Sequence, residues 1–288
     1  MPSRILAVAV ATGLACLCGA RANADPDFGY VYKAQVEEPG ETEVSLWATD
    51  RRGKGEGHYD AQDYRIEAER GITERFQASI YANVASHHIR GLAGEFGPVD
   101  RDFAFQGLSA EFIYQLRDPK NGRLGIAVYA EPAWSRISKV TGQKGDEYEL
   151  ELRAIVQKNF LADRLVWAAN LTVEPEWERE HEEIAPGFVS SKTEKELGVE
   201  VSTGLAYHVA PRLWIGAEGR YHSLYPDWTH GLHRENYAVY AGPSVHYAGN
   251  EWSVTATWQP QLFGGPDPGL EFDDHERREF RVKLSKEF

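Results

Sequence analysis

Cysteine and methionine are almost missing from this chain. Its two cysteines, Cys16 and Cys18, and its single methionine all lie within the first 24 residues, MPSRILAVAVATGLACLCGARANA. This stretch has an early basic residue, an apolar run over residues 5–17 and a final Ala-Asn-Ala, a combination typical of a cleaved secretory signal. We predict that residues 1–24 are removed. The mature chain then has no thiol, which excludes disulfides, a cysteine nucleophile and a thiolate metal site.

Long hydrophobic runs are also missing. The apolar part of the signal, residues 5–17, is shorter than the roughly 18–20 residues that a helix needs to span a bilayer, and no longer run follows it. The sequence therefore argues against membrane-spanning helices. If this protein enters a membrane, it does so by another structure.

Basic residues are outnumbered by acidic ones. Without Arg4 and Arg21, which lie in the predicted signal, 29 basic side chains stand against 44 acidic ones, a net charge of −15. Binding to nucleic acid depends on clustered Lys and Arg that neutralise phosphates. We therefore expect no nucleic acid partner and consider cationic or neutral ligands more suitable.

The mature sequence alternates between apolar and polar residues over long stretches. In RLVWAANLTVEPEW (164–177) and KELGVEVSTGLAYHV (195–209), one face is mainly apolar and the opposite face is polar or small. A period of two predicts strands and not helices. The chain contains about twelve such stretches, at residues 41–52, 58–70, 75–89, 102–117, 122–137, 147–159, 164–178, 194–209, 212–224, 235–247, 251–261 and 275–288.

Two kinds of connection alternate between these stretches. Short turns such as RGITER and VAPR are followed by long, polar connections such as RRGKGEGH and EREHEEIAPGFVSSKT. An even number of strands with this asymmetry is typical of bacterial outer-membrane barrels, which satisfy every backbone hydrogen bond internally and need only one apolar face per strand. We predict an all-β chain whose residues 41–288 form one transmembrane antiparallel β-barrel of about twelve strands in an up-and-down meander. A soluble secreted or periplasmic β protein is the alternative.

The segment before the first predicted strand is DPDFGYVYKAQVEEPG, residues 25–40. Its pattern leaves three placements open: a periplasmic arm, a segment that fills the lumen, or an extension of the first strand. Aromatic residues near the strand ends predict two interfacial girdles. The girdle residues expected after short turns are Phe76, Trp214 and Trp252, and those expected toward long connections are Trp134, Trp177 and Trp258.

Two stretches, FGYVYKAQVEEPGETEVSLW (28–47) and YRIEAERGITERFQASIYANV (64–84), carry a resemblance to a known family. With its aromatic-Gly-Tyr start, its Pro-Gly turn and an acidic strand entering GITERFQASIY, the chain resembles a family of uncharacterised outer-membrane β-barrel proteins of Gram-negative bacteria. The resemblance covers most of the mature chain. It implies the fold and the location, and it brings no functional residues with it.

The chain ends on REFRVKLSKEF, which alternates like a strand. We predict that Phe288 lies at the periplasmic edge of the last strand as a signal for the outer-membrane assembly machinery. Lys286 stands where outer-membrane proteins commonly have an apolar residue, although a rim Lys can extend its amine to the headgroups. An even strand number predicts that both termini are periplasmic.

If the apolar faces contact lipid, the opposite faces line the lumen. An acidic lining favours cations or neutral polar solutes, but the same side chains can instead pair and close the interior. About twelve strands with long side chains leave at most a slim passage, because about eight strands are already filled by side chains. The predicted lumen-lining residues are Arg65, Glu67, Glu69, Glu111, Glu131, Glu147, Glu149, Glu151, Arg153, Glu174, Glu176, Glu200, Glu218, Arg220, His222, Arg281 and Lys283.

Several clusters contain residue types that can carry chemistry. The acidic runs EPEWEREHEEI (174–184) and DDHERR (273–278) offer oxygen ligands for hard cations. His230 with His233 offers imidazoles for a transition metal. A solvated polar loop is the simpler explanation for each of these stretches. His222 and Ser223 are adjacent and face opposite ways on a strand, so they cannot form a dyad. Neither a nucleophile elbow nor an HExxH pattern occurs. We predict no catalytic residue, metal site or cofactor.

These patterns predict a narrow passive channel or binding pore for small cationic or neutral polar solutes in the Gram-negative outer membrane. Its expected partners are outer-membrane lipid, lipopolysaccharide, the assembly machinery and a small polar solute. The first alternative is a closed structural or surface-interaction barrel whose acidic outer loops bind lipopolysaccharide or cations. A lipid-modifying barrel enzyme is a third and weaker interpretation.

Overall fold

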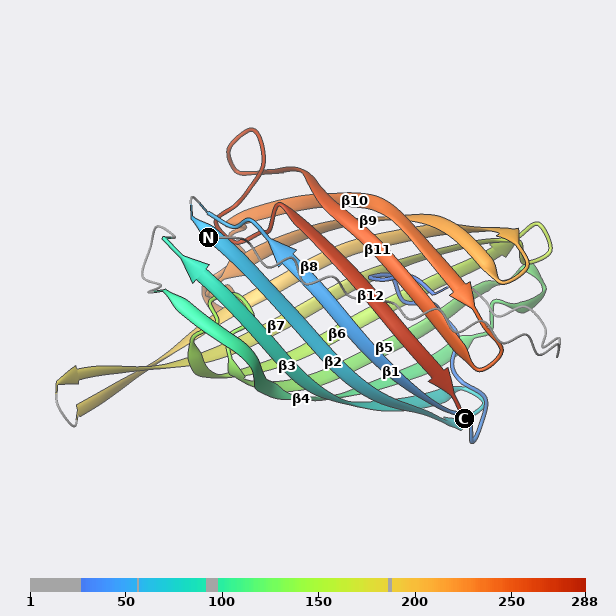
Figure 1. The fold of residues 1–288 in the computed structure, drawn as a ribbon, viewed down its shortest axis with the longest axis horizontal. Coiled ribbons are helices and arrows are strands. Elements are labelled where there is room, and N and C mark those ends of the chain that lie inside the picture. Colours follow the sequence, from blue (N-terminus) through green and yellow to red (C-terminus); the bar gives the residue numbers. More distant parts are fainter. Residues whose placement is uncertain (1–26, 56, 92–97, 186–187) are drawn as a thin grey trace, which may run out of the picture.

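The computed structural model describes residues 27–288, apart from 56, 92–97 and 186–187, and does not describe the side chains of 180–192. The predicted signal, residues 1–24, lies outside the described residues. Each strand is antiparallel to the next, and the last strand pairs with the first to close a barrel (Figure 1). The strands are β1 Thr42–Arg52, β2 His58–Thr73, β3 Phe76–Arg90, β4 Val99–Arg117, β5 Leu124–Ile137, β6 Lys144–Phe160, β7 Leu165–Ala185, β8 Phe188–Ala210, β9 Leu213–Pro226, β10 Asn236–Ala248, β11 Trp252–Gly265 and β12 Arg278–Glu287.

This architecture confirms the prediction of an all-β, twelve-stranded antiparallel barrel with meander order. Helical structure in the described residues consists of two short 3-10 turns, η1 Lys120–Gly122 and η2 Trp228–His230. No helix among these residues is long and apolar enough to cross a membrane. The tight turns and the C-terminus of β12 lie at one end of the barrel, which we call the short-turn end, and the opposite end is the long-loop end.

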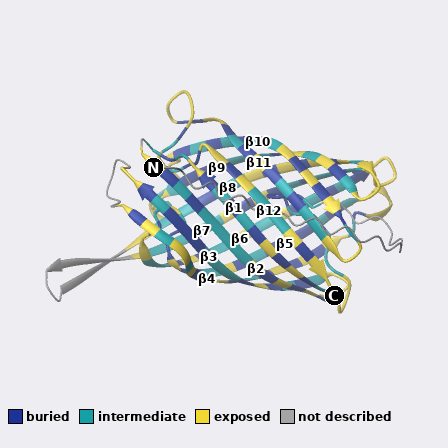
Figure 2. Ribbon diagram, viewed as in Figure 1, coloured by how far each residue is buried: buried dark blue, intermediate teal, exposed yellow. Residues whose placement is uncertain are grey.

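The two faces of each strand differ sharply in exposure, and Figure 2 shows the resulting alternation along the wall. On β12, Leu284 is 44% exposed whereas the next residue, Ser285, is 1% exposed. On β1, Leu46 is exposed and Ser45 is buried. Apolar side chains therefore cover the outside and polar side chains fill the inside, the reverse of a soluble protein. A closed barrel tolerates this arrangement in lipid because its backbone donors and acceptors pair between strands.

The prediction that Trp214 joins an aromatic girdle is wrong. Trp214 is 2% exposed, packs in the interior with Phe28 and stacks on His208 with 4.6 Å between ring centroids. The next residue, Ile215, faces outward and is 52% exposed. Because side chains alternate at every residue of a strand, the outward placement of Ile215 turns Trp214 inward.

The prediction that residues 179–193 form a long loop is also wrong. β7 and β8 continue through most of this region, and Glu183 on β7 pairs with Val189 on β8. The apolar alternation stops where β7 and β8 extend beyond the band of exposed apolar side chains. Backbone hydrogen bonds between the two strands continue there, because they do not require apolar side chains. A polar strand of this kind therefore reads as a loop in the sequence.

Deleting Phe288 should lower assembly of the barrel in the outer membrane. The Phe288 amide donates to the carbonyl of Thr42 at 2.9 Å, its ring is largely exposed, and the Lys286 amine lies 4.7 Å from the ring centroid. The exposed ring is thus available for recognition at the short-turn end. The fraction of folded protein in outer-membrane preparations measures the effect, with Lys286→Ala as the comparison. Wild-type levels of folded protein after the deletion would contradict an assembly role.

Candidate functional site

The predicted lumen residues lie on the buried side of the barrel wall. Because the wall is a single sheet whose other face is exposed, buried side chains on the strands point into the interior. The fully buried ones are Glu67, Glu69, Glu111, Glu131, Glu147, Glu149 and Glu218. The half-buried ones are Arg65, Glu151, Arg153, Glu174, Glu176, Glu200, Arg220, His222, Arg281 and Lys283.

Carboxylates concentrate on β6 and β7. The sequence Glu-x-Glu-x-Glu on β6 places three of them on one face, and register puts Glu149 of β6 opposite Glu176 of β7. Carboxylate oxygens approach within 4.8 Å of one another in two groups of three. We call these five residues the acidic wall: Glu147, Glu149, Glu151, Glu174 and Glu176.

The acidic wall is only partly neutralised by cations. The Lys139 amine, from the β5–β6 connection, lies 2.5 Å from Glu149 and 4.0 Å from Glu174. Glu151 accepts from the Nε of its strand neighbour Arg153 at 2.8 Å. Glu147 and Glu176 form no ion pair within the described side chains. Carboxyl groups without a cation at ion-pair distance therefore remain along this part of the interior.

A second carboxylate group lies on β2 and β4. The Tyr81 hydroxyl is 2.6 Å from an oxygen of Glu67 and 2.6 Å from an oxygen of Glu111. Glu69 contributes a third carboxylate, with all three within 4.8 Å of one another. Inside the barrel, Glu131 of β5 forms an ion pair with Arg65 of β2. These groups lie close together and form a compact polar part of the interior.

Residues 27–41, which we call the lumen segment, run inside the barrel and reach β1 at the short-turn end (Figure 1). A lone segment has no strand partner, so its amides need other acceptors. The Glu218 carboxylate accepts from the amides of Gly29, Tyr30 and Val31 at 2.8, 2.7 and 3.2 Å. Asn170, Gln157 and Gln77 accept from the amides of Tyr32, Ala34 and Glu37.

Side chains of the lumen segment pack against basic residues of the wall. The Tyr30 ring lies 4.0 Å from the guanidinium carbons of both Arg220 and Arg281, and Arg153 lies 4.4 Å from the Tyr32 ring. Such cation–π contacts strengthen when they are removed from water. The arginines are thereby held against the segment and not left free in an open lumen.

Two glycines allow the lumen segment to approach the wall closely. A Cβ at Gly204 would lie 2.8 Å from the Phe28 ring, and a Cβ at Gly71 would lie 2.1 Å from the carbonyl oxygen of Glu38. The Gly40 amide also donates to the Gly71 carbonyl at 2.9 Å. Larger residues at these positions would push the segment away from β8 and β2.

A cavity of about 960 Å³ lies between the lumen segment and the wall at the short-turn end. Its lining reaches Arg212 and Asn250 in the turns and extends inward to Tyr32. Charged and aromatic side chains are both present in its lining. Among them are Asp27, Lys33, Glu37, Glu43, Trp47, His246, Trp252 and Lys283.

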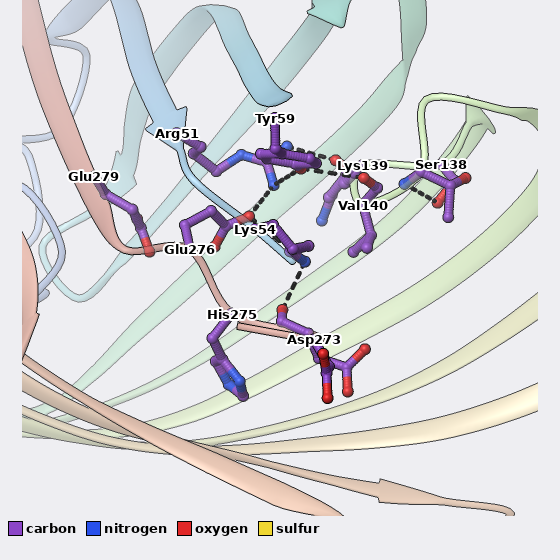
Figure 3. Close-up of polar contacts among 12 residues, drawn as sticks. Arg51, Lys54, Tyr59, Ser138, Lys139, Val140, Asp273, His275, Glu276 and Glu279 are labelled. Atoms are coloured by element: carbon purple, nitrogen blue, oxygen red, sulfur yellow. Dashed lines mark hydrogen bonds and ion pairs between the residues drawn. The ribbon is translucent and has the colours of Figure 1, made fainter. Parts of the chain in front are cut away.

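At the long-loop end, three connections meet inside the barrel mouth (Figure 3). Glu276 contacts the Arg51 guanidinium at 2.8 Å and the Lys54 amine at 3.7 Å, and Lys54 also donates to the Asp274 carbonyl at 2.6 Å. The Tyr59 hydroxyl donates to the Val140 carbonyl at 3.1 Å. Side chains from β1 and β2 thus tie the β5–β6 and β11–β12 connections together.

Electrostatics keep Glu276 ionised in this network. Burial acts to raise its pKa, but Lys54 and Arg51 outweigh burial and lower the pKa to about 2. The Glu276 carboxylate therefore stays charged throughout the physiological range. We name Arg51, Lys54, Tyr59 and Glu276 the mouth network.

Most of the mouth network lies outside the set of predicted lumen residues. Arg51 shares the inward face of β1 with Trp47 and Thr49, so alternation could have identified it. Lys139 and Glu276 lie in connections without periodicity, and no sequence pattern indicates that they fold inward. His222 was predicted in the lumen, but its contact with His275 was not foreseen. Ser223 donates to the Val199 carbonyl and not to His222.

Raising the pH should loosen the lumen segment near Glu37. Burial and the neighbouring Glu43 raise the pKa of Glu37 to about 7, with Asp27 and Glu287 acting in the same direction against Lys33. A pKa raised on folding gives stability that is present at low pH and lost as the pH rises through about 7.

Hydrogen-exchange protection factors for residues 30–37, compared at pH 5.5 and pH 8.5, measure this effect. We expect protection to fall about tenfold or more, since one pKa unit corresponds to about 1.4 kcal/mol. Glu37→Gln should remove most of the pH dependence. Equal protection at both pH values in the wild type would contradict the proposed coupling.

The chain matches one family model and shares its fold with solved β-barrels. A model for a family of unknown function (DUF6662) matches residues 21–288. The COG4313 outer membrane channel from Pseudomonas putida F1 is 11% identical with a TM-score of 0.58, and the alignment covers 91% of this chain and 99% of that chain. The translocator domain of the autotransporter NalP from Neisseria meningitidis is 11% identical with a TM-score of 0.52, covering 87% and 90%. No curated protein gives a significant match. At these identities the likeness establishes a shared fold alone.

Proposed function

The chain belongs to the family of unknown function DUF6662, and we propose that it is a narrow outer-membrane channel or binding pore for small cationic or neutral polar solutes. The observation that carries this proposal is the acidic wall, whose carboxylate oxygens approach within 4.8 Å in two groups of three. Among the described side chains, no cation forms an ion pair with Glu147 or Glu176. In a barrel with a purely structural role, a basic partner for each of these carboxyl groups would be expected to stabilise the fold.

Electrostatics favour a cation beside the acidic wall. Two unit charges about 4 Å apart repel by about 1 kcal/mol in water and by about 4 kcal/mol at the effective dielectric constant of a protein site. A cation that passes or binds relieves this repulsion, whereas an anion adds to it. Charged rings of Asp and Glu select for cations in other pores by the same effect.

The contents of the barrel support a narrow pathway. Twelve strands enclose more space than the eight-stranded barrels that side chains fill, but here the lumen segment takes part of that space. We propose that the short-turn end faces the periplasm, as in bacterial barrels with short periplasmic turns. In this orientation both described chain ends are periplasmic, the exposed apolar band contacts outer-membrane lipid, and the long connections meet lipopolysaccharide.

A closed structural barrel is the second candidate. The mouth network at one end and the lumen segment at the other hold the interior together, and both would suit a barrel that only presents its acidic outer connections to lipopolysaccharide or cations. Conduction distinguishes the two candidates.

Purified, refolded protein in planar lipid bilayers provides the test. We expect discrete current steps with a permeability for K⁺ greater than that for Cl⁻. An absence of current at every voltage, with the barrel shown to be folded, would overturn the channel and leave the structural barrel. A preference for anions would contradict the role of the acidic wall.

A further inference from the structure

Two histidines meet inside the barrel near the long-loop end. His222 lies on β9, and His275 comes from the β11–β12 connection, which folds inward. Nδ1 of His222 and Nε2 of His275 are 3.0 Å apart, and the rings cross at 72° with 5.2 Å between centroids. His275 is labelled in Figure 3, where it projects from the same stretch of chain as Glu276. Two imidazole nitrogens thus converge on one point of the interior.

A buried carboxylate fixes the state of His275. An oxygen of Glu271 lies 2.5 Å from Nδ1 of His275, and the other oxygen accepts from the amide of Asp273 at 2.7 Å. Glu271 is thereby held as an anion that accepts the proton on Nδ1. In the neutral imidazole of His275 the lone pair is then on Nε2, which is the atom that faces His222.

The connection that carries His275 is held rigidly. The Gln261 amide group of β11 donates to the Glu271 carbonyl at 2.6 Å, and its oxygen accepts from the Glu271 amide at 2.6 Å. The Tyr240 hydroxyl donates to the Glu276 carbonyl at 2.9 Å. The two residues that flank this turn of the connection are therefore fixed to the wall, and His275 does not depend on a ligand for its position.

Glu200 can become a third donor only by turning its side chain, because its carboxylate does not lie within 4.8 Å of both imidazoles. It is the cross-strand partner of His222 on β8, and its one contact with Arg220 is long, at 3.5 Å. Arg220 has a closer partner in Glu279, at 2.7 Å, which compensates its charge. Glu200 can therefore turn from Arg220 toward His222 without leaving a buried cation unpaired.

We propose that His222 and His275, with Glu200 as an oxygen donor, form a binding site for a divalent transition metal such as Zn²⁺ or Cu²⁺. Imidazole nitrogens suit these metals, and two His with one Glu is a donor set that leaves a further position open. Glu271 acts as the outer carboxylate that orients a metal-binding histidine. It is a positioning residue and not a ligand.

Binding requires one rearrangement of protons. Without metal, Nδ1–H of His222 donates to the lone pair on Nε2 of His275. With metal, both nitrogens donate lone pairs to the ion, so the proton of His222 moves to its Nε2 through water, and each imidazole stays neutral. The proposal concerns binding alone and holds whether or not the barrel conducts ions.

Titration of the folded, detergent-solubilised protein with Cu²⁺, followed by electron paramagnetic resonance, tests the site. We expect one tightly bound Cu²⁺ per chain with hyperfine coupling from two imidazole nitrogens. His222→Ala and His275→Ala should each weaken binding by tenfold or more and lose one nitrogen coupling. Glu271→Gln should weaken binding about 10–100-fold, as outer-shell partners of metal ligands do.

His230→Ala is the matched control, because His230 is an exposed histidine that contacts Asp227 at 3.0 Å outside the barrel interior. Its binding should equal that of the wild type. A wild-type spectrum without two nitrogen couplings would overturn the proposal even if the variants failed to fold. Equal Cu²⁺ affinity in the wild type and in a folded His222→Ala/His275→Ala double variant would overturn it as well.

Discussion

Removing residues 27–37 should raise the single-channel conductance several-fold. These residues occupy the interior beside the 960 Å³ cavity and hold Arg153, Arg220 and Arg281 against Tyr30 and Tyr32. Without them the passage widens at the short-turn end and the arginines reach water. The barrel itself should still assemble, because the closing pairs between β1 and β12 begin only at Glu43.

The deletion is best made behind an intact signal, keeping Asp25 and Pro26, and conductance is compared in planar bilayers. Glu218→Ala provides a point variant, since it leaves the amides of Gly29, Tyr30 and Val31 without their acceptor. Each hydrogen bond to a charged group contributes about 1.5–3 kcal/mol. We expect frequent openings of intermediate size in this variant.

Glu251→Ala is the control for Glu218→Ala, because Glu251 is an exposed acidic residue in the turn between β10 and β11. It should conduct like the wild type. Unchanged conductance in a folded deletion variant would show that the lumen segment does not limit the pathway.

Neutralising Glu147 and Glu176 together should bring the K⁺ to Cl⁻ permeability ratio close to one. Among the described side chains these two members of the acidic wall form no ion pair, so Glu147→Gln/Glu176→Gln removes two ionisable carboxyl groups and leaves the contacts of Lys139 with Glu149 and Glu174 in place. The side chains keep their size, and the packing of β6 against β7 should be preserved. Reversal potentials in a salt gradient measure the ratio.

Ionic strength separates electrostatic selection from a change of pore width. The Debye length is about 10 Å at 0.1 M salt and about 3 Å at 1 M. The difference between the double variant and the wild type should therefore be large at low salt and small at 1 M. Glu74→Gln, in an exposed turn, is the control. A double variant as cation-selective as the wild type would remove the acidic wall from the proposed function.

Much of the barrel could be predicted from the sequence because the side of the wall that each residue faces depends on its neighbours along the strand. Period-two alternation located all twelve strands, mostly within a few residues of their observed bounds. The failures had local causes too. β7 and β8 run past the predicted loop boundary because backbone pairing continues after the apolar alternation ends, and Trp214 faces inward because register, not residue type, decides the side.

The sites depended on contacts that no pattern records. Alternation placed Glu149 and Glu176 on inward faces, but their closeness follows from the register of β6 with β7. Lys139, His275 and Glu276 belong to irregular connections, whose direction is set by packing and not by a repeat.

The strand number, the antiparallel meander and the division into an apolar outside and an acidic inside could be predicted from the sequence, since each follows from neighbouring residues along the chain. What the inside contains depends on how the strands close around it. Residues 27–41 are polar enough for a solvated arm and aromatic enough for a packed one, and closure of the barrel brings Glu218, Asn170 and Gln157 around them as acceptors for their amides. That choice depends on residues more than a hundred positions away, which is why it could not be derived from the segment alone.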